Sequence, residues 1–520
     1  MTDWKPRYNP WLIALTVTLA TFMEVLDTSI ANVALPHIAG NLSAGVDEST
    51  WVLTSYLVAN AIILPLSAWF SSLMGRKNYY MLSVGIFTLS SCLSGLAPSL
   101  FWLVTFRILQ GLGGGGLQPS EQAILADTFP AEKLGMGMAV YGVAVVTAPI
   151  IGPTLGGWIT DNFSWRWIFF INIPVGLLSI YLTSRIVEDP PHLERRAVKG
   201  LNIDFVGLSA VALGIGALQI FLDKGQREDW FESHFIIVMA VFAAAALLFA
   251  VVWELRQKDP IVDIRLMREP SFAASIILMF MLGFILYGST VLLPLFLQTL
   301  MGYSATTSGL VLSPGGLVTM MTMPLVGFLL TKVDARRLVG LGMAVLAISL
   351  FRMGRFNLEI DYRTAMMARV VQSAGLAFLF IPISTVAYSF VAHGKRNQAS
   401  GLINFARNIG GSVGIAFCTT MLVRYAQRHQ SVLSSHATAT SPAFQSALRQ
   451  MTASLHWAGQ PLGRAHAMAL GMVYGELVRQ ANMLAYADVF RLMAYVSLSA
   501  ILLIFFLKKN RPPKGPVSVH

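Results

Sequence analysis

The sequence predicts an all-helical protein that crosses a membrane many times, and three observations point to this fold class. The composition is strongly apolar, the chain contains fourteen long apolar stretches, and motifs of its first half recur in its second half. Repeated halves of the same orientation are typical of transporters. We therefore expect two six-helix halves with two further helices inserted between them.

The composition excludes a water-soluble body. Of the 520 residues, 55% are hydrophobic and only 12% are charged, and the mean hydropathy is +0.63. Soluble domains average about 25% charged residues, and disordered chains are still more polar. The two cysteines, Cys92 and Cys418, lie in apolar runs, which excludes a disulfide scaffold and a cysteine-based zinc site. We expect no metal.

The apolar stretches are long enough for membrane-spanning helices. Such a helix needs about 20 mostly apolar residues, whereas transmembrane β-strands are about 10 residues long with alternating polarity. The first stretch is too long for the core of a signal peptide, so we expect no cleaved leader. The eleventh is the shortest. The fourteen stretches are residues 11–35, 51–73, 79–98, 101–125, 136–158, 167–186, 203–222, 235–254, 273–298, 306–330, 338–352, 364–390, 400–423 and 488–507.

The positive residues predict the orientation. With the N-terminus inside, the inner segments hold 22 of the 37 Lys and Arg residues, and the short outer loops hold 6. Because Lys and Arg concentrate on the cytoplasmic side of membrane proteins, we expect both termini in the cytoplasm. The net charge of +11 is then a topology signal, and we expect no nucleic-acid partner.

An internal repeat divides the chain. Arg107 and Gln110 in the fourth stretch recur as Arg369 and Gln372 in the twelfth, 262 residues later. Gly75-Arg76-Lys77 is echoed by residues 334–337, and Leu35-Pro36 by Leu293-Pro294. Parallel halves related by an axis along the membrane normal are indicated. The expected divisions are a cytoplasmic N-terminus (1–10), a first half (11–186), a linker with two inserted helices (187–272), a second half (273–507) and a cytoplasmic tail (508–520).

Two acids lie within the first stretch. Asp27 is at bilayer depth, where a charge costs about 2.5–3.5 kcal/mol on insertion scales, so a functional role is the default hypothesis. Glu24 lies three residues earlier, on the same helical face. Two such carboxyls disfavour double ionisation, so at least one should bind a proton in the physiological range. The alternative is that Asp27 caps a helix break before Pro36.

Arg107 is a cation within the fourth stretch. Because guanidinium does not deprotonate in proteins, it could pair with an ionised carboxylate and lose that partner when the acid is protonated. The alternative is that it extends to the membrane surface. Arg369 occupies the repeated position.

The motifs around these residues resemble the fourteen-helix drug:proton antiporter branch of the major facilitator superfamily, close to its EmrB-like group. The matching segments are residues 26–36, Arg107, Gln110 and Gly111, residues 148–157 and residues 165–176. Two positions depart from the family: Ala68 and Ser72 stand where the loop after the second span usually has a Gly and, four residues later, an Asp. Only Gly75, Arg76 and Lys77 of that loop motif are intact.

The resemblance implies a proton-coupled exporter of lipophilic drugs or toxic compounds, driven by the proton gradient without a cofactor and without enzymatic activity. It implies a place in the bacterial inner membrane, with a periplasmic adaptor of the EmrA-like membrane fusion type and an outer-membrane channel as partners. The expected proton-coupling residues are Asp27, Glu24 and Arg107. The expected cavity residues are Asn32, Gln110, Asn404, Arg407 and Asn408, although the last three could instead form a structural network. The expected antiporter motif is Gly142, Pro149, Gly152, Pro153, Gly156 and Gly157.

Residues 424–487 form the one sizeable hydrophilic insertion. Within it, 443–456 and 463–486 read as amphipathic helices, and a loop this long is usually functional or disordered. Docking of the adaptor is the preferred interpretation, and a cap over the cavity is the alternative.

Two rival functions remain. A transporter of the same fold with a dedicated substrate, such as a fatty acid or a siderophore, fits the same motifs. A receptor or channel fits less well, because of the repeat and Asp27. An ATP-driven pump would need a Gly-x-x-x-x-Gly-Lys-Ser/Thr loop, which the sequence lacks.

Overall fold

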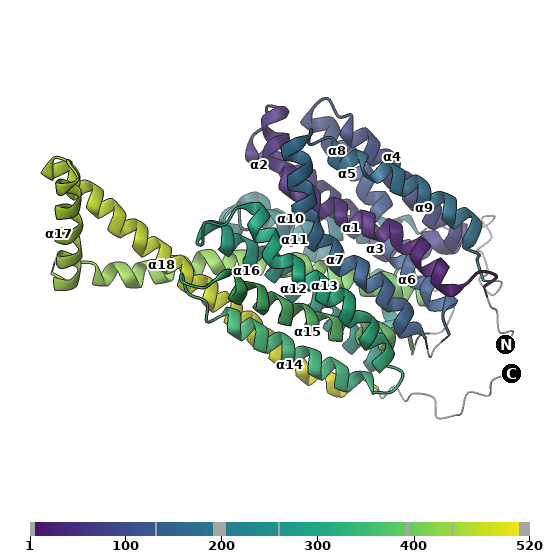
Figure 1. The fold of residues 1–520 in the computed structure, drawn as a ribbon. Helices are drawn as coiled ribbons and strands as arrows, with labels where there is room; N and C mark the ends of the chain where they lie inside the picture. The colour runs from purple at the N-terminus through teal and green to yellow at the C-terminus, as the bar shows by residue number, and fades with distance from the viewer. Residues whose placement is uncertain are drawn as a thin grey trace.

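The computed structural model describes residues 6–130, 133–190, 204–257, 260–389, 391, 395–438 and 440–508, and these residues form helices and connecting turns without a strand. The helices lie side by side in a bundle, and one helical arm extends from it (Figure 1). Local chemistry begins the first helix at residue 10. Asn9 accepts a hydrogen bond from the Trp11 amide, and Pro10, which needs no backbone donor, takes the first helical position.

The first half contains nine helices or helix pieces. The stretch predicted at 101–125 is divided at Gly115 and Gly116, since glycine is a poor helix former. The helices are α1 (Pro10–Asn41), α2 (Val46–Ser49), α3 (Trp51–Met74), α4 (Arg76–Gly95), α5 (Leu100–Gly114), α6 (Leu117–Thr128), α7 (Leu134–Asn162), α8 (Trp167–Phe170) and α9 (Asn172–Ile186).

The inserted pair and the second half follow. The inserted helices are α10 (Phe205–Lys224) and α11 (His234–Arg256), joined through the 3-10 turn η1 (Trp230–Glu232). The second half begins after η2 (Ile264–Arg268). It contains α12 (Pro270–Thr299), α13 (Ala305–Leu329), α14 (Ala335–Met353), α15 (Tyr362–Ser389), α16 (Arg396–His436), α17 (Pro442–Trp457), α18 (Leu462–Ser499) and the 3-10 segment η4 (Ala500–Phe506).

Each of the fourteen predicted stretches lies on a helix or a pair of helix pieces. In the described part of the chain, eleven helices are apolar and long enough to cross a membrane, and α7, which bends by 44°, makes a twelfth. The other two are α4, which begins with Arg76 and Lys77 and is rich in serine, and α14, which carries three arginines. The protein is a multi-pass helical membrane protein, and the number of fourteen crossings stays a prediction.

The two halves meet along two seams. Helix α7 packs against α13 on one side, and α3 packs against α16 on the other. Helix α10 lies over the second seam: it packs on α3, and its Gln219 donates a hydrogen bond of 2.9 Å to Ser412 of α16. The inserted pair therefore covers the α3/α16 seam.

The segment at 424–487 differs from the expected loop. Helix α16 continues without interruption to His436, and the second amphipathic helix is the beginning of α18, which runs on into the last predicted span. No proline or glycine lies between 424 and 436, so nothing in the chain stops the helix at the membrane boundary. With α17, these helix ends form the projecting arm of Figure 1.

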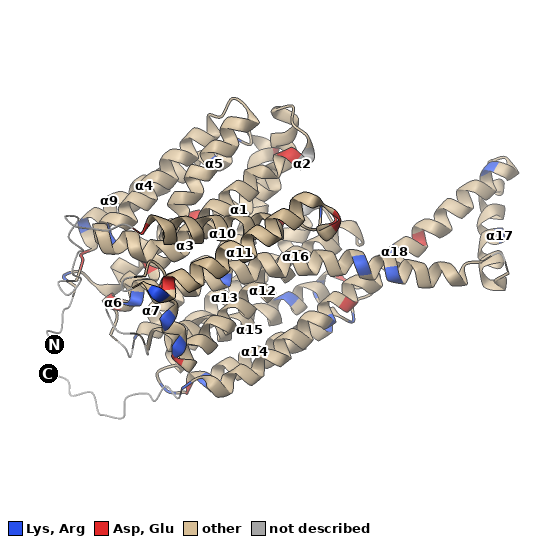
Figure 2. Ribbon diagram, turned by 180° about the vertical axis from the view of Figure 1, so that it is seen from behind, with Lys and Arg blue, Asp and Glu red and all other residues tan. Residues whose placement is uncertain are grey.

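Charges gather at the ends of the helices and on the arm, and the sides of the bundle are largely uncharged (Figure 2). Helix α11, for example, exposes Phe235, Val238, Val241, Leu248 and Val252. Exposed apolar side chains around a whole helix are typical of contact with lipid.

Candidate functional site

An ion pair lies inside the first half, between α1 and α5. Nη1 of Arg107 donates a hydrogen bond of 2.6 Å to Oδ2 of Asp27. Asp27 is 2% exposed and Arg107 is completely buried. A buried charge is expensive unless it is paired and hydrogen-bonded, and these two residues provide that pairing for each other.

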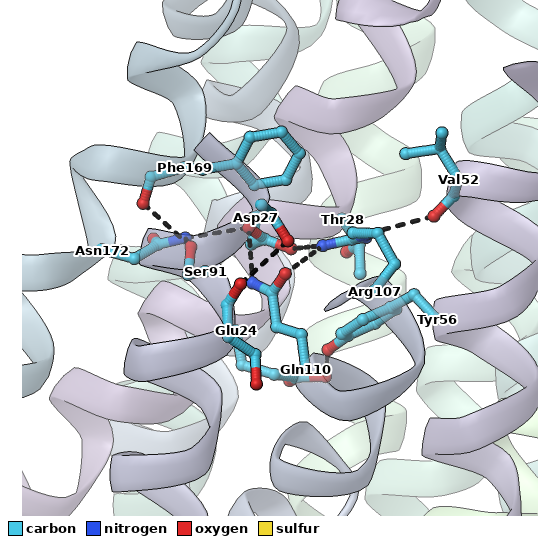
Figure 3. A network of polar contacts seen from close by, with 12 residues as sticks. Glu24, Asp27, Thr28, Val52, Tyr56, Ser91, Arg107, Gln110, Phe169 and Asn172 are labelled. Atoms are coloured by element: carbon cyan, nitrogen blue, oxygen red, sulfur yellow. Dashed lines mark hydrogen bonds and ion pairs between the residues drawn. The ribbon is translucent and has the colours of Figure 1, made fainter. Parts of the chain in front are cut away.

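Two amides complete the surroundings of the Asp27 carboxylate (Figure 3). Its Oδ1 accepts hydrogen bonds from Nε2 of Gln110 at 3.0 Å and from Nδ2 of Asn172, at the start of α9, at 2.8 Å. Nδ2 of Asn172 also donates to Ser91 of α4 at 2.9 Å. Helices α5 and α9 therefore contribute the partners of this α1 carboxylate, and α4 holds Asn172 in place.

Arg107 is held on its other sides as well. Its Nε donates to the Val52 carbonyl at 3.0 Å and its Nη1 to Oε1 of Gln110 at 2.8 Å, and its guanidinium carbon lies 4.2 Å from the centre of the Tyr56 ring. Its Nη2 is buried without a hydrogen-bond partner among the described residues. The side chain points to Asp27 (Figure 3), and its complete burial is against the alternative that it extends to a membrane surface. Gln110, expected in the cavity, is fully buried in this network.

Glu24 has neutral partners. Its Oε1 accepts hydrogen bonds from the Tyr56 hydroxyl at 2.9 Å and from Asn60 at 3.1 Å, and its Oε2 accepts from Gln118 at 2.6 Å. Gln118 in turn accepts a hydrogen bond from Nη2 of Arg407, on α16 of the second half. One side chain therefore connects Glu24 of the first half with a cation of the second.

The other polar residues of α16 lie at the same contact between the halves. Asn404 donates to Gln122 at 2.9 Å and accepts from the Tyr141 hydroxyl at 3.1 Å. Asn408 donates to Asn60 at 3.2 Å. Asn404 and Arg407 are buried, and Asn408 is partly buried. Asn32 is exposed on α1 and takes no part in this network.

The glycines of α7 allow close contact with both halves. A Cβ on Gly152 would lie 2.4 Å from the side chain of Ser29, and one on Gly142 would lie 2.7 Å from Met323 of the second half. Gly156 packs against Ile30, whereas Gly157 has open space around it. Packing therefore does not require a glycine at position 157.

The prolines of α7 explain its contact with α1. Pro153 has no N–H, so the Pro149 carbonyl lacks its usual intrahelical donor. The Ser29 hydroxyl donates to that carbonyl at 3.1 Å. This hydrogen bond, at the bend of 44° in α7, attaches α7 to α1 two residues after Asp27.

The loop motif lies at the opposite end of α3 from the α16 arm. Gly75, at φ 82°, separates α3 from α4. Arg76 pairs with Asp127, and Arg396 of α16 pairs with the same carboxylate at 2.9 Å. Lys77 donates to the Ser184 carbonyl at 2.7 Å. Among the described residues, Ser72 bonds only to the Trp69 carbonyl of its own helix, and Asp127 supplies the carboxylate that joins the halves here.

Several of these residues were not predicted from the sequence: Asn172, Gln118, Gln122, Tyr141, Asp127, Arg396 and Glu121. Glu121 is fully buried on α6, with Oε1 accepting from Thr18 at 2.5 Å and Oε2 without a partner among the described residues. An acid inside an apolar stretch is a sufficient signal to find it. No group of three or more potential metal ligands occurs in the part of the chain that the structure describes.

Comparison with known proteins gives the family. A family model for the Major Facilitator Superfamily matches residues 17–415. The chain is 37% identical over 506 residues to the multidrug export protein EmrB of Haemophilus influenzae, covering 97% of this chain and 96% of that protein. It is 37% identical over 479 residues to the fatty acid resistance protein FarB of Neisseria gonorrhoeae, covering 92% of each.

The fold agrees with this relationship. The solved structure of the proton:xylose symporter XylE matches with a TM-score of 0.63 at 15% identity, covering 97% of each chain. The repeat, the helical bundle and the matches over nearly the full length lead to one conclusion. The chain belongs to the major facilitator superfamily.

Proposed function

We propose that this protein is a proton-coupled antiporter that exports lipophilic drugs or toxic compounds across the bacterial inner membrane. The observation that carries the proposal is the buried pair of Asp27 and Arg107. The similarity to EmrB supports the substrate class.

The geometry suggests how one proton changes the site. While Asp27 is ionised, it and Arg107 neutralise each other. Protonation removes the carboxylate charge, but Arg107 keeps its own because guanidinium does not lose a proton in proteins. A buried cation without a partner is strongly unfavourable. Proton binding would therefore favour a rearrangement that gives Arg107 a new partner or water.

The second half would sense this change through Glu24. Glu24 lies on the same helical face as Asp27, and Gln118 links it to Arg407. A change in position or charge at Glu24 therefore acts directly on a hydrogen bond between the halves. An inward proton releases about 2.3 kcal/mol per 100 mV of membrane potential, which is enough to break contacts of this kind.

The test is transport by Asp27→Asn, which removes the titrating group but keeps size and polarity. In proteoliposomes, an ethidium gradient should drive counter-movement of protons in the wild type and none in the variant. Asp161→Asn is the matched control, since Asp161 lies at the end of α7 with its side chain 69% exposed. Undiminished proton movement in Asp27→Asn would remove this residue from the mechanism.

We also propose that both termini are cytoplasmic and the arm periplasmic. Helix α1 begins at the end of the bundle away from α17 (Figure 1). Lys508, after η4, pairs at 2.6 Å with Glu269 at the start of α12, which is predicted to be inside. Trp457 on the arm is 89% exposed. In a variant without Cys92 and Cys418, Trp457→Cys should react with an impermeant thiol reagent added to the outside of whole spheroplasts.

The arm suits docking of a periplasmic adaptor and, through it, an outer-membrane channel. Helix α16 has 41 residues, about 60 Å at 1.5 Å per residue, whereas the hydrocarbon core is about 30 Å thick. The arm exposes Trp457, Leu462, Met472 and Tyr474. Exposed apolar side chains beyond the bilayer are typical of an interaction surface.

Replacing residues 436–478 by a Gly/Ser linker distinguishes a docking role of the arm from a role as a cap over the cavity. The proton site lies in the helices of the bundle, so ethidium transport in vesicles should survive. Resistance should fail in cells with an outer membrane, because drug released to the periplasm partitions back. Loss of both would indicate a cap or a folding role, and retention of both would exclude docking.

A dedicated substrate is the second candidate, favoured by the similarity to FarB. A fatty-acid exporter would protect cells against long-chain fatty acids but not against ethidium. Susceptibility to both compounds, compared with and without the gene, distinguishes the two functions.

A further inference from the structure

An apolar cavity lies in the first half, away from the contact between the halves. It has a volume of about 470 Å³ and lies between α1, α7, α8 and α9. Ligand pockets are typically about 300–1,000 Å³ and mostly apolar, with few polar groups. The volume therefore suits a small organic molecule of two or three rings.

Aromatic side chains form much of its wall. Phe22 comes from α1, Trp158 from α7, Phe163 follows α7, and Trp167 begins α8. Trp158, Phe163 and Trp167 are each more than half exposed on the side of the bundle. Tryptophan is enriched at the membrane–water interface, so these residues place the mouth of the cavity at the outer surface of the hydrocarbon region.

Asn172 is the polar residue of the lining. It is 1% exposed, and its Nδ2 donates to Asp27 at 2.8 Å and to Ser91 at 2.9 Å. Both amide hydrogens are thus in use. No described residue donates a hydrogen bond to its Oδ1, so this acceptor in the cavity lining is available to a ligand. A ligand that brings an O–H or N–H group would satisfy it.

We propose that this cavity is a binding subsite for uncharged aromatic molecules that carry a hydrogen-bond donor, entered from the outer half of the bilayer. The rings lie among the aromatic side chains, and the donor bonds to Oδ1 of Asn172. The same amide donates to Asp27, so the ligand is one side chain away from that carboxylate. The role of the subsite in export rests on the proposed function, but its occupancy does not.

A matched pair of ligands tests the donor. The probes are 2-naphthol and 2-methoxynaphthalene, which share the ring system but differ in the O–H. Binding to the protein in lipid nanodiscs is followed by energy transfer from tryptophan, after correction for partition into empty nanodiscs. One hydrogen bond to a buried acceptor predicts about two- to tenfold tighter binding of the naphthol.

A matched pair of variants tests whether the ligand binds in this cavity. Val175 lines the cavity, so Val175→Phe should fill it and weaken naphthol binding at least about tenfold. Leu177→Phe makes a similar addition on the same helix, at a side chain that is 60% exposed, and should bind as the wild type does. Circular dichroism checks that both variants fold.

Equal affinity for the two probes would show that Asn172 does not bind the ligand's donor. Unchanged binding by a folded Val175→Phe would show that the ligand does not bind in this cavity. No proton gradient is present in this assay. A failure of proton coupling at Asp27 therefore leaves the binding result intact, and loss of binding leaves the coupling test intact.

Discussion

The two halves of the molecule share equivalent helices and a repeated motif, but they differ in their buried acidic residues. Arg107 and Arg369 occupy equivalent helices, and each donates from Nη1 to the glutamine three residues later, at 2.8 and 2.7 Å. Both arginines are buried. The repeated sequence thus gives the same local geometry twice.

The acids Asp27 and Glu24 of the first half have no acidic counterparts in the second half. In the register set by Leu35-Pro36 and Leu293-Pro294, the counterpart of Asp27 is Ile285 and that of Glu24 is Leu282. Arg369 contacts Thr290 at 3.3 Å and has no ion pair among the described residues. The arginine–glutamine pair is therefore part of the geometry that the two halves share, whereas the acids to which we assign proton binding occur in the first half.

The largest difference is expected from the same change at both arginines. Arg107→Met leaves Asp27 buried without its cation, and breaking a buried pair costs about 3–5 kcal/mol. It should abolish ethidium-driven proton movement and lower the thermal midpoint. Arg369→Met removes a cation that has no acidic partner in the described part of the chain, so transport should remain above half of wild type. Equal losses in both variants would remove the distinction between the halves.

A smaller effect is expected at Glu24. Glu24→Leu copies the residue of the second half, and Glu24→Gln keeps hydrogen-bonding capacity for Tyr56 and Asn60. Coupling measured as protons moved per ethidium should fall in both variants but, unlike in Asp27→Asn, should not vanish, since the pair of Asp27 and Arg107 is intact. Wild-type coupling in Glu24→Leu would show that this acid is not needed.

The contact between the halves at Asp127 tests the comparison further. Asp127 pairs with Arg76 and Arg396, so Asp127→Asn weakens a contact between halves and should slow transport severalfold. Asp334, in the repeated loop motif, caps its own helix by accepting from the Arg336 amide at 3.0 Å and forms no ion pair within the described ranges. Asp334→Asn is therefore the control, with transport rates close to wild type. Slower transport in the control than in Asp127→Asn would contradict this assignment.

The smallest effect is expected within the glycine motif of α7. Gly157→Ala meets no atom within 4 Å and should change the free energy of unfolding by less than about 0.5 kcal/mol. Gly152→Ala collides with Ser29, near Asp27, and should impair both stability and transport. Thermal unfolding of the two variants checks the order, and the reverse order would show that α1 and α7 do not pack as described.

Much of this could be predicted from the sequence. The positions of the helices follow from long apolar runs, and Asp27, Glu24 and Arg107 stand out because charges are rare at bilayer depth. Asn172 and Gln118 could not be selected, since a lone amide in an apolar run has no signature until its partners are known. The shape of the arm was missed for a different reason: a helix that continues past the membrane changes its surroundings but not its periodicity.

We propose that Asp27 binds the proton and that the second half has no equivalent residue. Infrared difference spectra between neutral and acidic pH report the protonated carboxyl group directly, without a substrate. We expect a carboxyl band in the wild type that loses the Asp27 component in Asp27→Asn and is unchanged in Arg369→Met. An identical band in Asp27→Asn would contradict the proposal.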